Sequence, residues 1–172
     1  VVYKGLAIPV GIEVKTSFIY VEGSSHFYDE LTAKGNELHV SILEQKLKEQ
    51  LGVSAINSDI LRTLGLLGSD VKYKNAGALL ADENSFYGID CARFGDSIDI
   101  ILDREIFEHK SILKQYDEAV TLYRKYYQYD EIEGALRKTV ELIPEKAFRE
   151  AIANALVHRT WDVNSHIRIA MF

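Results

Sequence analysis

The sequence contains little cysteine, methionine or proline. Cys91 is the only cysteine among 172 residues, which excludes an internal disulfide and a metal site built from several thiolates. It lies in the apolar run 88–94, which predicts a buried and unreactive thiol. With 2 prolines and 11 glycines, little of the chain has the composition of a linker, and the length suits one large domain or two small ones.

No hydrophobic run is long enough to cross a membrane, and the sequence has no recognisable signal peptide. A membrane-spanning helix needs about 18 consecutive apolar residues, and the opening segment is interrupted by Lys4, Gly5 and Glu13. We therefore expect a cytoplasmic protein with no membrane partner. The chain begins at Val1 and ends in an alternating segment, 166–172, with no turn after it, which predicts a fragment of a longer protein.

Basic residues are not in excess. The 20 Lys and Arg residues stand against 26 Asp and Glu residues, for a formal net charge of −6. Between positions 103 and 160, ten basic residues alternate with eleven acidic ones, so no basic face is expected there. The chain from Val1 to Phe172 is therefore predicted to bind DNA poorly by itself.

Hydrophobic periodicity predicts an α+β fold, in which helices accompany a mixed antiparallel sheet. A β-rich segment opens the chain at 1–28. Further strands are predicted at 76–81, 88–94, 97–103, around 133–142, and from 166 onward. Helices are predicted at 38–52, 58–67, 105–128 and 144–159.

Five of the ten tyrosines lie between positions 116 and 129, close to Arg124 and Lys125. Aromatic side chains interleaved with basic ones can stack on nucleic-acid bases. However, three of these tyrosines share a helical stripe with apolar residues, which favours core packing over base stacking. The stripe consists of Ile106, Leu113, Tyr116, Val120, Tyr123 and Tyr127.

The last predicted helix carries the candidate chemistry. Its apolar arc consists of Ala147, Phe148, Ala151, Ile152, Ala155 and Leu156. Glu150, Asn154 and His158 follow one another every four residues along the border of this arc, where half-buried polar groups are expected. A carboxylate and an amide one turn apart can coordinate a hard cation or orient water. Alternatively, the three residues form only a boundary row whose hydrogen bonds satisfy the polar groups at the helix surface. Periodicity alone favours this alternative but does not decide between the two.

The string PEKAFREAIANALVHR at 144–159 resembles the proline-led helix of the RecG-related, ATPase-like domain of bacterial transcription regulators. That domain is similar to the gyrase, chaperone and histidine-kinase ATPases, so the resemblance implies the start of a divergent Bergerat-type ATPase layer. It also implies a general base at Glu150, a Mg²⁺ ligand at Asn154, and a cofactor-binding set of Glu150, Asn154, His158 and Arg159. The family's HRDY segment is replaced here by HRTWD at 158–162, which displaces the acidic residue.

Two further strings extend the resemblance. The segment 61–85 is similar to the family's linking region, with Asn75, Ala76 and Gly77 as turn and close-packing positions. The segment FIYVEGSS, 18–25, resembles the last strand of a Schlafen-type AlbA domain, which binds DNA. The resemblance implies DNA-phosphate contacts from Lys4, Lys15, Ser24 and Ser25, whereas a solvated hairpin end accounts for the same residues equally well. The implied organisation is an AlbA-domain tail at 1–37, a linking α+β region at 38–143, and a truncated ATPase-like domain at 144–172.

These observations predict part of a cytoplasmic, DNA-binding transcription regulator related to RecG-type helicases. ATP and Mg²⁺ are expected only in a longer chain, because the acidic box and the glycine-rich lid of the ATPase family would follow Phe172; hydrolysis by these residues alone is not expected. DNA contacts are expected mainly from regions outside them. Two alternatives stay open: a Mg²⁺-dependent ATPase, and an interaction scaffold in which the helix 105–128 docks a second copy as a homo-oligomer.

Overall fold

The structure is a computed structural model that describes residues 7–8, 12–15, 28–34, 38–53, 55–134 and 136–172. It has the predicted α+β class, with helices beside a mixed sheet. The helices are η1 (Tyr28–Glu30), α1 (Ser41–Leu51), α2 (Ser58–Thr63), α3 (Asn75–Leu80), α4 (Ile112–Tyr127) and α5 (Glu145–His158). The strands are β1 (Ala7–Ile8), β2 (Ile12–Lys15), β3 (Ile89–Phe94), β4 (Ile101–Phe107), β5 (Gln128–Glu133), β6 (Leu136–Glu141) and β7 (Ile167–Met171).

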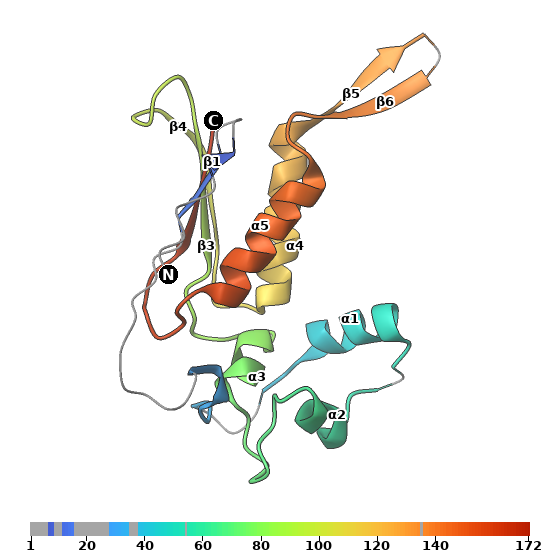
Figure 1. Cartoon of the computed structure of the whole chain (residues 1–172), viewed down its shortest axis with the longest axis vertical. Coiled ribbons are helices and arrows are strands. Elements are labelled where there is room, and N and C mark those ends of the chain that lie inside the picture. Colours follow the sequence, from blue (N-terminus) through green and yellow to red (C-terminus); the bar gives the residue numbers. More distant parts are fainter. Residues whose placement is uncertain (1–6, 9–11, 16–27, 35–37, 54, 135) are drawn as a thin grey trace.

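The main sheet has five strands in the order β1-β2-β7-β3-β4 (Figure 1). Strands β3 and β7 run parallel, with Ile89 beside Ile167, and the other neighbours run antiparallel. The parallel pair is possible because α4 and α5 provide the long crossover between β3 and β7. The sheet therefore contains strands from all three predicted segments, 1–37, 38–143 and 144–172. The domain boundaries stay a prediction.

Helices α4 and α5 pack side by side on one face of this sheet, where they form the main core (Figure 1). Tyr123, Phe148 and Ile152 lie fully inside it, facing Ile89 and Ile169 of the sheet. The prediction that Tyr123 and Tyr127 pack in the core is confirmed. The hydroxyl of Tyr123 donates a hydrogen bond to the carbonyl of Ile143, which satisfies a polar group that burial would otherwise penalise.

A second hydrophobic cluster holds α1 and α2 together below the sheet. It consists of Leu43, Leu61, Leu66 and Leu67. The first turn of α1 is capped by Asp82, whose carboxylate accepts hydrogen bonds from the backbone N–H groups of Ser41 and Ile42, both at 2.9 Å. Burial would raise the pKa of Asp82, but these bonds and the Ser41 hydroxyl together hold it below its usual value. Asp82 thus fixes α1 to the segment that precedes β3.

The segment 76–81 was predicted as a strand, and this prediction is wrong, because Asn75–Leu80 forms helix α3. Alanine and leucine are strong helix formers, so a short apolar run does not distinguish the two structures. The close-packing role predicted for Gly77 is confirmed, because a Cβ atom there would lie 2.9 Å from the Leu66 carbonyl oxygen. Asn75 is buried and donates a side-chain hydrogen bond to the Tyr28 carbonyl at 2.9 Å.

Two predicted boundaries in the middle of the chain are also wrong. The strand expected at 97–103 is β4, which starts at Ile101 and continues to Phe107. The long helix therefore begins at Ile112 rather than near position 105. Ile106, assigned to the helical stripe, lies in β4 and is 43% exposed. The residues 101–107 are two apolar, three charged and two apolar residues in turn, so they show no strand alternation. Ile106 lies seven residues before Leu113, which is also helical spacing, so periodicity alone did not locate the start of the helix.

Strands β5 and β6 form a separate hairpin, which projects from the ends of α4 and α5 (Figure 1). The strand predicted around 133–142 is found as β6, whereas β5 was assigned to the preceding helix. The turn passes through Gly134, which adopts a positive φ of 64°. We call this hairpin, residues 128–141, the arm.

Cys91 is 2% exposed in the centre of the sheet. Burial, together with the negative charges of Asp90 and Glu105, raises the pKa of its thiol to about 12. The prediction of a buried, unreactive cysteine is confirmed. Among the described residues, no helix combines the length and the apolar character that crossing a membrane requires.

Candidate functional site

Helix α5 carries the predicted polar row on its solvent side. Glu150, Asn154 and His158 are all exposed, so the expectation that they are half buried is wrong. Only Phe148, Ile152, Ala155 and Leu156 of the predicted apolar arc are buried. Because these four residues pack toward α4 and the sheet, Ala147 and the polar row lie on the solvent side of α5.

Glu150 and Asn154 lie one helical turn apart, as their spacing predicts. The Asn154 amide donates a hydrogen bond to the Glu150 carboxylate, with 3.3 Å between Nδ2 and Oε1. This bond leaves the Asn154 carbonyl oxygen and the second Glu150 oxygen free of hydrogen bonds within the described part of the chain. Two oxygen ligands on one helix face are therefore available to an incoming group.

Glu150 also borders an open hollow of about 460 Å³ between α4, α5 and the base of the arm. The other carboxylates in the hollow already have partners. Glu145 accepts hydrogen bonds from Arg124 and Gln128 at 2.6–2.9 Å, and Glu141 accepts one from the backbone N–H of Glu145 at 2.9 Å. Both oxygens of Glu141 accept hydrogen bonds, whereas Glu150 forms no ion pair with any other described residue and only one of its oxygens accepts a hydrogen bond. Glu150 is therefore the carboxylate in the hollow with an oxygen available to a ligand.

The donor set agrees with the chemistry of magnesium. Mg²⁺ takes oxygen ligands, keeps several waters, and is commonly held by one or two protein groups together with substrate phosphates. Glu150 and Asn154 supply a carboxylate and an amide oxygen, and their exposure leaves room for those waters and phosphates. Within the described residues no cluster of three or more His, Cys, Asp or Glu side chains is arranged to hold a metal ion.

Arg159 lies directly after α5, and its guanidinium contacts the backbone of two other segments. It donates hydrogen bonds to the carbonyl of Tyr87 at 2.8 Å and to the carbonyl of Ser165. Its guanidinium carbon lies 4.2 Å from the centre of the Trp161 ring. Burial lowers the pKa of Arg159, and the contacts tie the end of α5 to the starts of β3 and β7. They account for Arg159 structurally, while the cofactor-binding role stays a prediction.

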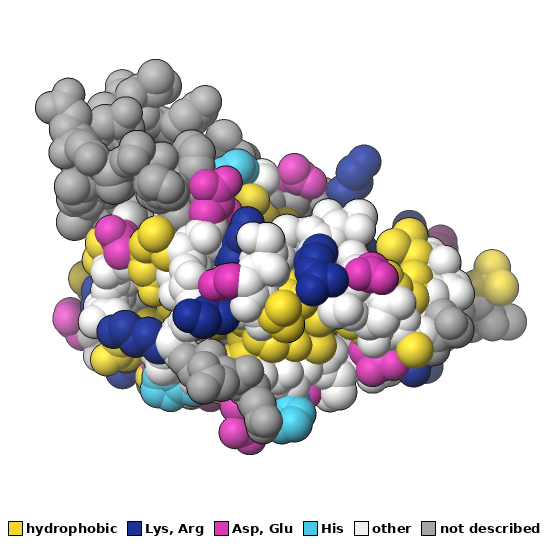
Figure 2. Space-filling model, turned by 90° about the horizontal axis from the view of Figure 1, so that it is seen from below, with side chains coloured by type: hydrophobic (Ala, Val, Ile, Leu, Met, Phe, Trp, Pro, Cys, Tyr) yellow, Lys and Arg dark blue, Asp and Glu magenta, His cyan; other side chains and the backbone are white. Residues whose placement is uncertain are grey.

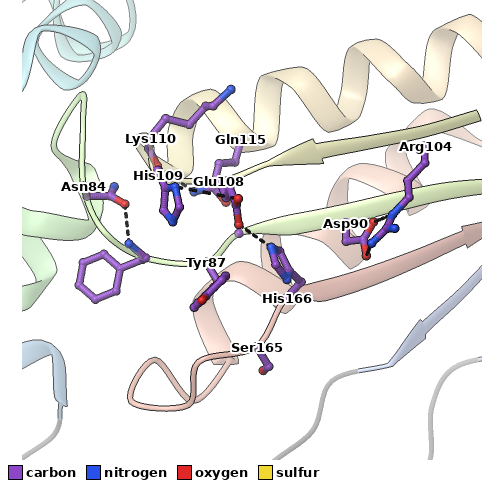
Figure 3. Close-up of polar contacts among 12 residues, drawn as sticks. Asn84, Tyr87, Asp90, Arg104, Glu108, His109, Lys110, Gln115, Ser165 and His166 are labelled. Atoms are coloured by element: carbon purple, nitrogen blue, oxygen red, sulfur yellow. Dashed lines mark hydrogen bonds and ion pairs between the residues drawn. The ribbon is translucent and has the colours of Figure 1, made fainter.

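A polar cluster that the sequence did not reveal lies at the end of the sheet nearest α3 (Figure 3). The Nε2 atom of His166 lies 2.5 Å from the Glu108 carboxylate. Tyr87 packs between two histidines, with ring centroids 4.9 Å from His166 and 5.9 Å from His109. The cluster joins the end of β4 to the start of β7. No sequence spacing connects Glu108 with His166, because they meet only through the pairing of both strands with β3.

A larger open hollow, of about 720 Å³, lies beside the start of α4. Three of its charged groups have partners, because Lys110 pairs with Glu118 at 3.0 Å and Asp82 caps α1. Glu83 and Lys114 also line the hollow and form no ion pair within the described residues. None of the site residues predicted from the sequence lies in this hollow, so we do not assign the functional site to it.

Asp90, on β3, is a buried carboxylate that no sequence pattern revealed. Arg104 of β4 donates two hydrogen bonds to it, at 2.8 and 2.9 Å (Figure 3). These bonds hold the pKa of Asp90 below its usual value against the opposing effect of burial, with further help from the charges of His166 and Arg168. The charged form of Asp90 thus stabilises the junction of β3 and β4.

Replacing Asp90 by asparagine is expected to reduce stability by about 1–2 kcal/mol at neutral pH, because the charged hydrogen bonds from Arg104 are lost. Since the folded-state pKa is lowered, the contribution of Asp90 is complete above its ordinary pKa of about 4 and disappears as the pH falls through the folded value. The free energy of unfolding in urea, measured at pH 7 and pH 3, should therefore fall less on acidification in Asp90→Asn than in wild type. Asp96→Asn, in the exposed turn, is the control; equal acid sensitivity in wild type and Asp90→Asn would contradict this account.

Of the predicted DNA contacts, Lys4, Ser24 and Ser25 lie outside the described residues. Lys15 ends β2 and pairs in register with Arg168. On the face shown in Figure 2, Lys and Arg side chains lie among Asp and Glu side chains rather than in one basic patch. This face agrees with the mixed charge pattern of the sequence.

Comparison with known proteins shows a likeness to a solved structure. The structure is similar to the crystal structure of the DIP2311 protein from Corynebacterium diphtheriae, with a TM-score of 0.67 and 26% sequence identity. The match covers 85% of this chain and 31% of that chain. This chain therefore spans about a third of the solved protein. No family model matches the sequence, and no curated protein matches it.

Proposed function

We propose that this chain belongs to a cytoplasmic, DNA-associated transcription regulator in which α5 contributes to a site for Mg²⁺ and a nucleotide. The observation that carries the proposal is the pair formed by Glu150 and Asn154. They lie side by side on the exposed face of α5, with free oxygen atoms, at the border of an open hollow. Their order and spacing agree with the resemblance of 144–159 to the RecG-related ATPase-like helix.

The two residues have different roles in this proposal. The Asn154 carbonyl oxygen ligates the cation, which when bound neutralises phosphate charge. Glu150 orients a water molecule on the same helix face and can accept its proton. The hydrogen bond from Asn154 to Glu150, at 3.3 Å, keeps the two side chains in one orientation before a ligand arrives.

The DNA-associated part of the proposal rests on the strings at 18–25 and 61–85, in the order found in AlbA-containing regulators. With a net charge of −6, most of the DNA affinity is assigned to regions of the longer protein outside these residues. Such affinity depends on phosphate contacts and falls steeply with salt. A salt-insensitive association would therefore count against it.

The nucleotide site is tested by thermal unfolding of the intact protein with and without Mg²⁺ and ATP. A ligand at about 100 times its dissociation constant adds about 2.7 kcal/mol, which raises the unfolding midpoint by several degrees. Asn154→Ala should abolish the Mg²⁺-dependent part of this shift. Glu150→Gln should retain binding but lose any turnover of ATP.

Asn164→Ala, at an exposed position beyond α5, is the matched control and should behave as wild type. Absence of a shift in the wild-type protein at millimolar Mg²⁺ and ATP would refute the nucleotide site. A mobility-shift titration at increasing salt tests DNA association separately. The two parts of the proposal can therefore fail independently.

A further inference from the structure

The arm is exposed on both faces and along both edges. Its two strands pair only with each other within the described chain. Every described residue at 129–139 is exposed, with Ile132 at 79% and Leu136 at 74%. An isolated two-stranded hairpin is marginally stable in water, and exposed strands carrying large apolar residues are typical of interaction sites.

The base of the arm is firmly attached to the core helices. Gln128 donates hydrogen bonds to Glu141 at 3.3 Å and to Glu145 at 2.9 Å. The backbone N–H of Leu142 donates to the carbonyl of Tyr127 at 2.9 Å. The arm therefore starts from a fixed position and direction, and its exposed part is held out from the body (Figure 1).

One face of the arm satisfies its own charges. Asp130 accepts hydrogen bonds from Arg137 and, at 2.9 Å, from Thr139. Ile132 lies on this same face, opposite Arg137 in the register. We call it the paired face, because its acidic and basic groups already have partners inside the arm.

The other face does not satisfy its charges. It consists of Tyr129, Glu131 and Glu133 on β5, and Leu136, Lys138 and Val140 on β6. Glu131 and Lys138 are opposite one another in the register, yet within the described residues neither forms an ion pair. Tyr129 is 50% exposed. We call this the docking face.

We propose that the docking face binds the docking face of a second copy of this chain, with a two-fold axis parallel to the arm. Such an axis places β5 of one copy against β6 of the other. Glu131 then lies opposite Lys138 of the partner subunit, and this contact occurs twice. Tyr129 packs against Val140 of the partner subunit near the base.

The distribution of charge favours a second copy over other occupants. On the docking face the acidic residues are confined to β5 and the basic residue to β6. This pattern is complementary to itself under the two-fold axis, whereas Glu131 and Glu133 would repel a nucleic-acid phosphate. Tyr123 and Tyr127 of the helix expected to dock a second copy are buried in the core, which leaves the arm as the exposed aromatic surface of this region.

The dimer is expected to be weak. Strands of six residues are about 20 Å long and, side by side, about 10 Å wide, so the two faces together bury on the order of 400 Å². Specific stable interfaces bury about 1,200–2,000 Å². We therefore expect association at high micromolar or higher concentrations, unless other parts of the intact protein add to it.

The test exchanges the charges in the intact protein. Glu131→Lys alone and Lys138→Glu alone each place like charges across the axis twice, and each should weaken association at least about tenfold in sedimentation equilibrium. An equimolar mixture of the two variants restores opposite charges between copies and should form a heterodimer. Mixing the two variants leaves the like charges within each arm unchanged. Recovery of association in the mixture therefore indicates a contact between copies.

Ile132→Lys, on the paired face, is the matched control and should associate as wild type. A second measurement traps the contact: Glu131→Cys mixed with Lys138→Cys should form a disulfide faster than either variant alone. The native Cys91 is buried and does not compete. Equal association by wild type, both charge variants and their mixture, or no preference for the mixed disulfide, would overturn the proposal.

Discussion

Substitution of Gly88 by alanine is expected to lower the free energy of unfolding by about 4 kcal/mol or more, the range reached by severe overpacking. A Cβ atom at this position would lie 2.0 Å from the carbonyl oxygen of Phe107 and 2.3 Å from the side-chain oxygen of Gln115. The first contact is with backbone, so no rotamer change can relieve it. The Gly88 carbonyl also accepts a hydrogen bond from the N–H of Ile167 at 2.8 Å, so a shift of Gly88 would disturb β7 as well.

Urea unfolding of the purified variant measures this loss. Gly134→Ala is the control, because Gly134 has no heavy atom within 4 Å of its added Cβ and only a positive φ of 64°. It should cost about 1 kcal/mol through backbone strain alone. A Gly88→Ala protein that unfolds within about 1 kcal/mol of wild type would show that Gly88 and Phe107 do not approach each other this closely.

Nothing near Gly88 in the sequence reveals this constraint. The run 88–94 predicts a strand, and β3 confirms it from Ile89 to Phe94. The crowding comes from the Phe107 carbonyl of β4 and from Gln115. Gln115 is fully buried and donates a hydrogen bond to the Lys110 carbonyl at 2.7 Å. A strand pattern specifies which side chains point inward, but not which distant residue lies against a given backbone atom.

Helix α5 shows which structural features hydrophobic periodicity can predict. The proline-led start and the apolar spacing predicted its limits to within a residue, and α5 runs from Glu145 to His158. The spacing also placed Glu150 beside Asn154, as the hydrogen bond between them confirms. Their burial was predicted wrongly, because a helical wheel fixes the angles between side chains and not the rotation of the whole helix against its neighbours.

The sequence did not reveal the polar groups that depend on strand pairing. Asp90 with Arg104, and Glu108 with His166, are each brought together across the sheet. The first strand of the arm, β5, was missed for another reason. β5 is largely polar and directly continues α4, so no apolar alternation separates the strand from the helix before it.

Substitution of Arg159 by alanine is expected to lower the free energy of unfolding by about 3 kcal/mol, because a partly buried charged donor with several backbone acceptors is removed. The Tyr87 and Ser165 carbonyls lose their Arg159 donor, and Trp161 loses the guanidinium stacked on its ring. Arg159→Lys should lose about half as much. Lysine keeps the charge but has no planar fork to reach several acceptors at once.

Measurements of stability and of ligand binding together distinguish a structural role of Arg159 from a nucleotide-binding role. If it serves only a bound nucleotide, Arg159→Ala should unfold in urea as wild type does and lose only the Mg²⁺- and ATP-dependent rise in the thermal midpoint. If it is a structural clamp, the ligand-free protein is destabilised, while Arg62→Ala, which removes one exposed ion pair on α2, changes stability by less than about 0.5 kcal/mol. We expect the second result, because the Arg159 guanidinium is already occupied by protein carbonyls and by Trp161, whereas the oxygens of Glu150 and Asn154 are not.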